Sequence, residues 1–141
     1  MHSHIAAHLR FRGELLLAGR IEALLDYYAF PLPIFLPAER LLLSGRPEAR
    51  LFLSLLRQRL LRDGVAALRP EVRAVELPRA GRFRVWADWN ELTLAGEAGR
   101  SSSAVYFCRA TALGPQVEMV NYTRASMPDL AQQFEALALS A

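Results

Sequence analysis

Three long runs of strand-like sequence, separated by two short turn segments, occupy the stretch from Phe83 to Thr123. The turns are residues 95–100, Ala-Gly-Glu-Ala-Gly-Arg, and residues 112–116, Ala-Leu-Gly-Pro-Gln. Glycine and proline at such points are typical of tight turns. Because leucine-rich helical segments precede these strands and can cover one face of them, we expect a curved antiparallel sheet folded over helices. An architecture of this kind usually encloses a pocket.

Length and composition favour one domain over residues 1–141, since a chain of 141 residues can bury a substantial core. The net charge of +3 is small, and the 17 basic residues, all arginine, are scattered along the chain. We therefore expect no nucleic-acid partner. The arginine-only basic set is typical of a GC-rich bacterial source.

Cys108 is the only cysteine, so no intrachain disulfide can form. The sequence begins without a basic region followed by an apolar core, which argues against a signal peptide. No apolar run approaches the roughly 18 residues of a membrane span. These observations predict a cytoplasmic protein without membrane contact.

Helices are predicted in four places. The first runs from about Ile5 to Ala18, and Gly19 suits the position after its end. The second has a single apolar stripe of Ile21, Leu24, Leu25 and Tyr28. Pro31 to Pro37 must run extended. A third helix begins near Pro47 and ends at Gly64, and a fourth carries Leu130, Phe134 and Leu137 at helical spacing.

The sheet is expected to begin near Glu71. In the first long strand, Phe83, Val85, Ala87 and Trp89 alternate with more polar residues. The run from Ser102 to Thr111 is apolar on both faces and therefore needs cover on both. The helices can cover one face, and a second subunit is our preferred cover for the other. The pattern leaves open which face of this strand lines the pocket.

This order of elements resembles the nuclear transport factor 2-like superfamily, which includes ketosteroid isomerase and the SnoaL-like polyketide cyclases. The resemblance covers about residues 9–124, and residues 126–141 would be a helical extension. It rests on four short pieces at matching spacing, namely Ala18-Gly19, Ser44-Gly45-Arg46, Glu71–Val75 and Val117–Tyr122. It implies an α+β cone, with N-terminal helices packed in the concavity of a strongly curved, mainly antiparallel sheet.

The isomerase mechanism is not supported by the residues at the matching positions. The general base of the isomerases corresponds to Leu36 here, and their oxyanion-stabilising tyrosine corresponds to Arg12. Their second proton donor maps to Tyr106 or Phe107. Because leucine cannot accept a proton, the isomerase set lacks its base.

The resemblance also predicts a pocket. Its candidate lining residues are Arg12, Leu16, Tyr28, Leu36, Phe52, Trp89, Glu91, Tyr106, Met119, Asn121 and Thr123. Asn121 is the sharpest polar candidate, because a buried amide needs hydrogen-bond partners. Several members have simpler alternatives: Trp89 packed in the core, Arg12 as a solvated helix arginine, and Glu91 exposed near its strand end.

Trp86, Asp88 and Asn90 alternate with the pocket residues, so the resemblance places them on the outer sheet face as a homodimer contact. His4 and His8 have a spacing that can hold a metal ion, but no third ligand is nearby. The other histidine, His2, is also N-terminal, so the His/Asp pairs of the dehydratases cannot form. We expect no metal and no cofactor.

Three functions are hypotheses at this point. The first is a binding protein for a small hydrophobic ligand, without the isomerase catalytic set. The second is an isomerase, dehydratase or cyclase that uses Glu91, Tyr106, Tyr28 or Arg12. An inward carboxylate with a raised pKa would favour it. The third is a non-catalytic protein-interaction module, with a filled interior and an exposed C-terminal helix.

Overall fold

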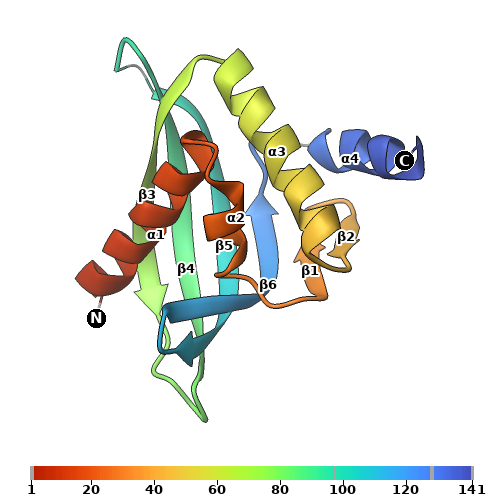
Figure 1. Ribbon diagram of the computed structural model, residues 1–141. Coiled ribbons are helices and arrows are strands. Elements are labelled where there is room, and N and C mark those ends of the chain that lie inside the picture. The colour runs from red at the N-terminus through yellow and green to blue at the C-terminus, as the bar shows by residue number, and fades with distance from the viewer. Residues whose placement is uncertain (1, 97, 128, 141) are drawn as a thin grey trace.

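The computed structural model describes residues 2–96, 98–127 and 129–140. It consists of a curved six-stranded sheet with three helices, α1 to α3, on its concave face and a fourth, α4, beside α3 (Figure 1). The helices are α1 (His2–Leu17), α2 (Ile21–Leu25), α3 (Arg46–Arg62) and α4 (Leu130–Ser140). The strands are β1 (Leu32–Phe35), β2 (Arg40–Leu43), β3 (Val65–Val75), β4 (Arg82–Thr93), β5 (Ala98–Thr111) and β6 (Gly114–Arg124). This arrangement confirms the predicted α+β class and the three-strand meander.

The sheet has the order β2-β1-β6-β5-β4-β3, in which only the β1–β6 pair is parallel. The extended segment predicted after α2 is β1, which forms an unexpected hairpin with β2. The predicted start of the sheet near Glu71 was wrong, because β3 begins at Val65, directly after α3. Glu97, in the first predicted turn, lies outside the described residues.

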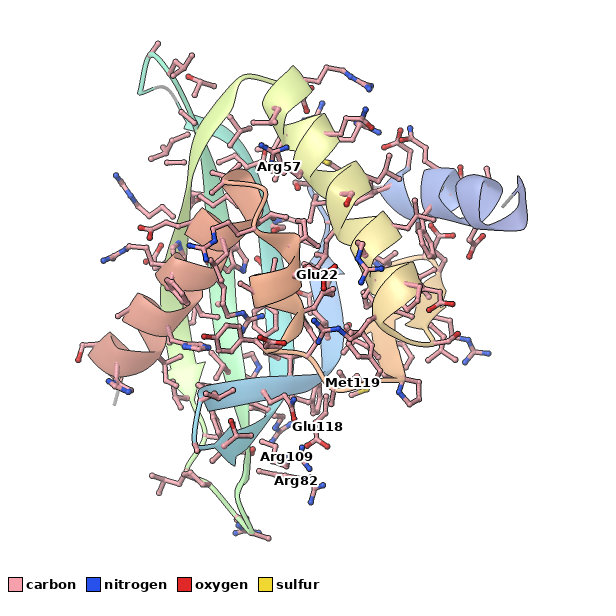
Figure 2. All side chains as sticks on the ribbon, in the orientation of Figure 1. Glu22, Arg57, Arg82, Arg109, Glu118 and Met119 are labelled. Carbon is pink, nitrogen blue, oxygen red and sulfur yellow. The ribbon has the colours of Figure 1, made fainter. Side chains whose placement is uncertain are left out.

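A hydrogen bond connects α3 to the C-terminal end of α1. The backbone at Gly19 has a φ of +76°, a conformation that favours glycine. The Arg57 Nε–H donates to the carbonyl oxygen of Leu17 over 3.1 Å, which places a cation at the negative end of α1 (Figure 2). Helix α1 also packs along β3, so its position relative to the sheet is set from two sides.

Strand β6 contains two bulges where it pairs with β5. Cys108 pairs with Val117, but the preceding Phe107 pairs with Met119, so Glu118 is an extra residue on β6. Thr123 is a second extra residue, near the end of the strand. Because side chains alternate along a strand, each extra residue exchanges the faces of the residues after it. Glu118, which has no pairing partner on β5, forms an ion pair with Arg82 on β4, with 3.0 Å between Glu118 Oε1 and Arg82 Nε (Figure 2).

Helix α4 packs against α3 of its own chain. The rings of Phe134 and Phe52 meet edge to face at 5.6 Å, and Arg59 forms a 3.1 Å ion pair with Asp129. Leu130 and Phe134 are buried there, whereas the side chain of Leu137 lies outside the described part of the structure. None of the helices within residues 2–96, 98–127 and 129–140 is long and apolar enough to cross a membrane.

Candidate functional site

A cavity of about 140 Å³ lies between α1, α3 and the concave face of the sheet. Residues 125–127, which precede α4, and residues 130 and 131 at its start form part of its wall. Most of its lining is aliphatic or aromatic, and the polar side chains in it are Arg12, Tyr28, Trp89, Glu91, Ser102, Tyr106, Tyr122 and Ser126. A dry cavity of about 150 Å³ in another protein accepts benzene, so this volume suits a small ring.

Arg12 is the buried cation of this cavity. It follows Leu9 and precedes Leu16 on the apolar side of α1, and its side chain is only 4% exposed. Its Nη2 donates to the Tyr28 hydroxyl over 3.1 Å. The guanidinium also lies 5.1 Å from the ring centroid of Tyr28 and 5.5 Å from that of Tyr106. The Arg12 Nε has no hydrogen-bond partner within the described structure.

A hydrogen-bonded aromatic cluster lies beside Arg12. The Trp89 indole N–H donates to the Tyr106 oxygen over 2.6 Å, and the Tyr106 and Tyr122 hydroxyls hydrogen-bond to each other. Burial raises the pKa of Tyr106 to about 12 and that of Tyr122 well above 10. Both hydroxyls are therefore neutral near pH 7 and can donate hydrogen bonds.

Gly13 makes room for the indole of this cluster. A Cβ atom at position 13 would lie 3.2 Å from Cζ3 of Trp89, closer than ordinary carbon contacts. The glycine thus allows α1 to approach β4 closely enough for the indole to form part of the cavity wall.

Glu91 supplies a carboxyl group to the same cavity. It lies two residues after Trp89 on β4 and is 5% exposed. Burial raises its pKa, and a hydrogen bond to Ser126 opposes that shift only in part. A protonated Glu91 could donate a hydrogen bond, and an ionised one could accept a proton.

Eight of the eleven predicted pocket residues do line the cavity: Arg12, Leu16, Tyr28, Leu36, Phe52, Trp89, Glu91 and Tyr106. Whether they bind a ligand stays a prediction. Two of the simpler alternatives are wrong, since Arg12 is not solvated and Glu91 is not exposed. The open question about β5 is also answered, because Tyr106 faces the cavity.

The prediction that three β6 residues line the pocket was wrong. Met119, Asn121 and Thr123 do not line the cavity, and Val120 and Tyr122 occupy that wall instead. The reason is the bulge at Glu118, which turns Met119 and Asn121 to the outer face, while Thr123 is itself the second extra residue. Strict alternation along β6 carries no signal of either bulge, and Ser126 likewise had no sequence signal.

The positions that resemble the isomerase site come together here. Leu36, Arg12 and Tyr106 all line the cavity, whereas Phe107 is on the neighbouring outward position of β5. The cavity therefore lies where the resemblance implied a pocket, and the Leu36 side chain on its wall cannot accept a proton.

Trp86, Asp88 and Asn90 lie on the outer sheet face, opposite the cavity. Register aligns Trp86 with Val105, Val105 with Asn121, and Asn121 with Phe35, so these side chains form one row across four strands. We call this row, with the adjacent Phe107 and Met119, the outer stripe. Trp86 is partly buried, with the Arg84 guanidinium 5.0 Å from its ring centroid.

Polar contacts flank the outer stripe on one side. Asp88 accepts hydrogen bonds of 2.7 Å from both Arg73 and Ser103. An apolar strip with a polar margin is the usual composition of a protein interface.

The two histidines that were considered as metal ligands, His4 and His8, have different environments. His4 is exposed, whereas the His8 ring packs edge-on against Tyr27 at 4.9 Å. Burial and the nearby Arg12 lower the pKa of His8 to about 4. Residues 2–96, 98–127 and 129–140 contain no group of three His, Cys, Asp or Glu side chains that could hold a metal ion.

Comparison with known proteins identifies the fold of this chain. No protein-family model and no curated protein matches the chain, but solved structures do. An NTF2-like protein with a cystatin-like fold from Novosphingobium aromaticivorans superposes with a TM-score of 0.64 at 15% identity, covering 92% of this chain and 85% of that one. The chain has the nuclear transport factor 2-like fold.

Two further structures share this fold. A domain of unknown function with a cystatin-like fold from Nostoc punctiforme has a TM-score of 0.63 at 20% identity, over 98% of this chain and 84% of that one. The β subunit of a benzoate 1,2-dioxygenase from Burkholderia mallei has a TM-score of 0.58 at 15% identity, over 85% and 87% of the two chains. At these identities the likeness concerns the fold alone.

Proposed function

We propose that this protein binds a small, mainly apolar molecule in the cavity between α1, α3 and the sheet. The observation that carries the proposal is the cavity itself, which has about 140 Å³ of space, apolar walls and a few converging polar groups. Binding sites for small molecules have this composition. The alternative of an interaction module required a filled interior and an exposed C-terminal helix, whereas Leu130 and Phe134 of α4 are buried.

Toluene is a suitable first probe because it is apolar and close to the cavity in size. We expect saturation-transfer NMR signals from toluene and a rise in the melting temperature of the protein as toluene is added. Leu56→Trp on α3 fills the cavity and should abolish both effects. Leu61→Trp, on the exposed side of the same helix, should leave them unchanged. Absence of toluene binding to the wild-type protein would contradict the proposal.

A second candidate function is catalysis on such a molecule, as in an isomerase, dehydratase or cyclase. The observation that favours it is Glu91, a cavity carboxyl group with a raised pKa. Buried carboxyl groups with raised pKa values are typical of general acids and bases. Tyr28 and Tyr106 could supply hydrogen bonds to a developing oxyanion.

Proton transfer can be tested without knowing the substrate. We expect the protein to accelerate the exchange of the α-protons of cyclohexanone in D₂O, measured by NMR, and Glu91→Gln to remove that acceleration. Glu14→Gln, an exposed position on α1, is the matched control. Equal exchange rates with the wild-type and Glu91→Gln proteins would exclude Glu91 as the base for this probe.

We also propose a homodimer through the outer stripe. Apart from Asn121, the stripe consists of apolar and aromatic side chains, and Phe35 within it is 37% exposed in the single chain. Among the described residues, α1, α2 and α3 lie over the opposite face of the sheet (Figure 1). Since the fold is shared with a protein that is itself a subunit of an assembly, a second copy of this chain is the partner we expect. Light scattering that gives a monomer mass at micromolar concentration would contradict this.

A further inference from the structure

We propose that the ligand of the cavity carries a single oxyanion, of the carboxylate class, and that Arg12 holds it. This inference depends on the proposed function, because it adds a charged group to the small apolar molecule proposed above. It begins from the state of Arg12, which is 4% exposed and lies on the cavity wall. An arginine side chain remains charged at all ordinary pH values.

Arg12 has no carboxylate partner in the described part of the chain, where the ion pairs involve other arginines. Glu91 lines the same cavity, but the groups that influence its ionisation are Ser126, Arg100 and Asp63 rather than Arg12. Burying a charge without a counter-ion is costly. The two tyrosine rings offset part of this cost through cation–π contacts, yet they leave the Arg12 Nε without an acceptor.

The polar cluster contains more hydrogen-bond donors than acceptors. Arg12 and Trp89 can only donate, and each hydroxyl brings one proton of its own. The Tyr28 oxygen already accepts from Arg12, and the Tyr106 oxygen already accepts from Trp89. One hydroxyl proton is used in the hydrogen bond between Tyr106 and Tyr122. The Tyr28 hydroxyl proton and the Arg12 Nε–H have no acceptor among the described residues of this cluster. An oxyanion placed between Arg12 and the tyrosines would provide several acceptor sites at once.

Charge and size limit the class of anion. Among the described residues that line the cavity, Arg12 is the only arginine, so one negative charge is balanced and a phosphate dianion is not. The rest of the wall is mostly apolar, and the cavity is about 140 Å³. A monocarboxylate on a small ring or a short hydrocarbon chain satisfies both limits.

Benzoate, its neutral analogue benzamide and the apolar toluene are the probes that test this. Isothermal titration at pH 7 should show benzoate binding to the wild-type protein at least about tenfold more tightly than benzamide, because charge-assisted hydrogen bonds are about twice as strong as neutral ones. Arg12→Met should remove this preference and bring the two dissociation constants within about twofold. Arg10→Met, exposed on the same helix, should retain it.

The other outcomes are distinguishable. If toluene and benzamide bind to the wild-type protein and benzoate binds no more tightly, the cavity is a neutral site and the carboxylate inference is wrong, while the proposed function stands. If none of the three probes binds, both are wrong. If the preference for benzoate persists in Arg12→Met, the charge is recognised elsewhere and the assignment to Arg12 is wrong. The comparison on wild-type protein holds even if Arg12→Met fails to fold.

Discussion

The indole N–H of Trp89 on β4 donates a 2.6 Å hydrogen bond to the hydroxyl oxygen of Tyr106 on the neighbouring strand β5. The two residues are not paired in register, since Trp89 lies opposite Ser102 and Tyr106 lies opposite Val85. The bond therefore spans the concave face diagonally. It fixes the orientation of the indole plane against α1 and that of the tyrosine hydroxyl beside Arg12.

We expect Tyr106→Phe to lower the free energy of unfolding by about 1–3 kcal/mol, because the buried Trp89 N–H loses its acceptor. Urea unfolding of Tyr106→Phe, Trp89→Phe and the double variant gives the coupling between the two residues, which should exceed about 0.5 kcal/mol. Additive losses would show that the bond contributes nothing to stability. Trp86→Phe on the outer face is the control for the loss of an indole.

The raised pKa of Glu91 predicts a pH dependence of stability. Because the folded pKa lies above the ordinary value of 4.5, the folded chain binds more protons than the unfolded chain above pH 4.5. Stability from this group is therefore lost as the pH rises through that window. Glu91→Gln does not titrate, so its stability relative to wild type should increase between pH 4 and 8, by about 1.4 kcal/mol per unit of pKa shift. A pH-independent difference would contradict this.

His8 predicts the opposite dependence. Its folded pKa of about 4 lies below the ordinary 6.5, so the unfolded chain binds more protons between these values, and stability is lost as the pH falls from 6.5 to 4. His8→Phe should flatten this part of the profile, by at most about 3 kcal/mol at pH 4 because one pKa unit corresponds to ~1.4 kcal/mol. Chemical denaturation at several pH values measures it. Parallel profiles for the two proteins would mean that His8 is accessible to protons when folded.

If the outer stripe is the dimer contact, one charged substitution within it should prevent dimer formation. Phe107→Arg places a cation in the middle of the stripe and should convert a dimer to a monomer in light-scattering measurements, since an unpaired charge in an apolar interface is costly. Leu113→Arg, at the exposed tip of the β5–β6 hairpin, should remain dimeric. Dimers of the Phe107→Arg protein would place the contact elsewhere.

The fold was predictable because its local signals agree with each other. Turn residues separate β4, β5 and β6, and Gly19 and Gly64 follow the ends of α1 and α3, where both have positive φ angles. The start of β3 was missed because Val65-Ala-Ala-Leu-Arg, which follows the two-residue turn after α3, has no marked alternation of apolar and polar residues. In that segment tertiary pairing with β4 decides the structure.

The site was predictable on the strands and helices that run without irregularity. On β4, alternation assigned Trp89 and Glu91 to one face and Trp86 to the other, as the structure has them. The burial of a side chain was harder to predict than the face of the helix or strand on which it lies. Arg12 and Glu91 are charged residue types that usually face solvent. They are inside because the tyrosines and residues 125–127, 130 and 131 enclose the cavity in three dimensions.

The bulge at Glu118 makes the pairing of β6 with β5 a determinant of pocket chemistry. If the two strands paired here without a bulge and every residue were kept, Met119 and Asn121 would turn inward in place of Val120 and Tyr122. Loss of the bulge alone would thus exchange an aromatic hydroxyl for an amide while the sheet order stays the same. Alignments of this chain with distant proteins of the same fold therefore need a gap at this position before any β6 residue is compared between their pockets.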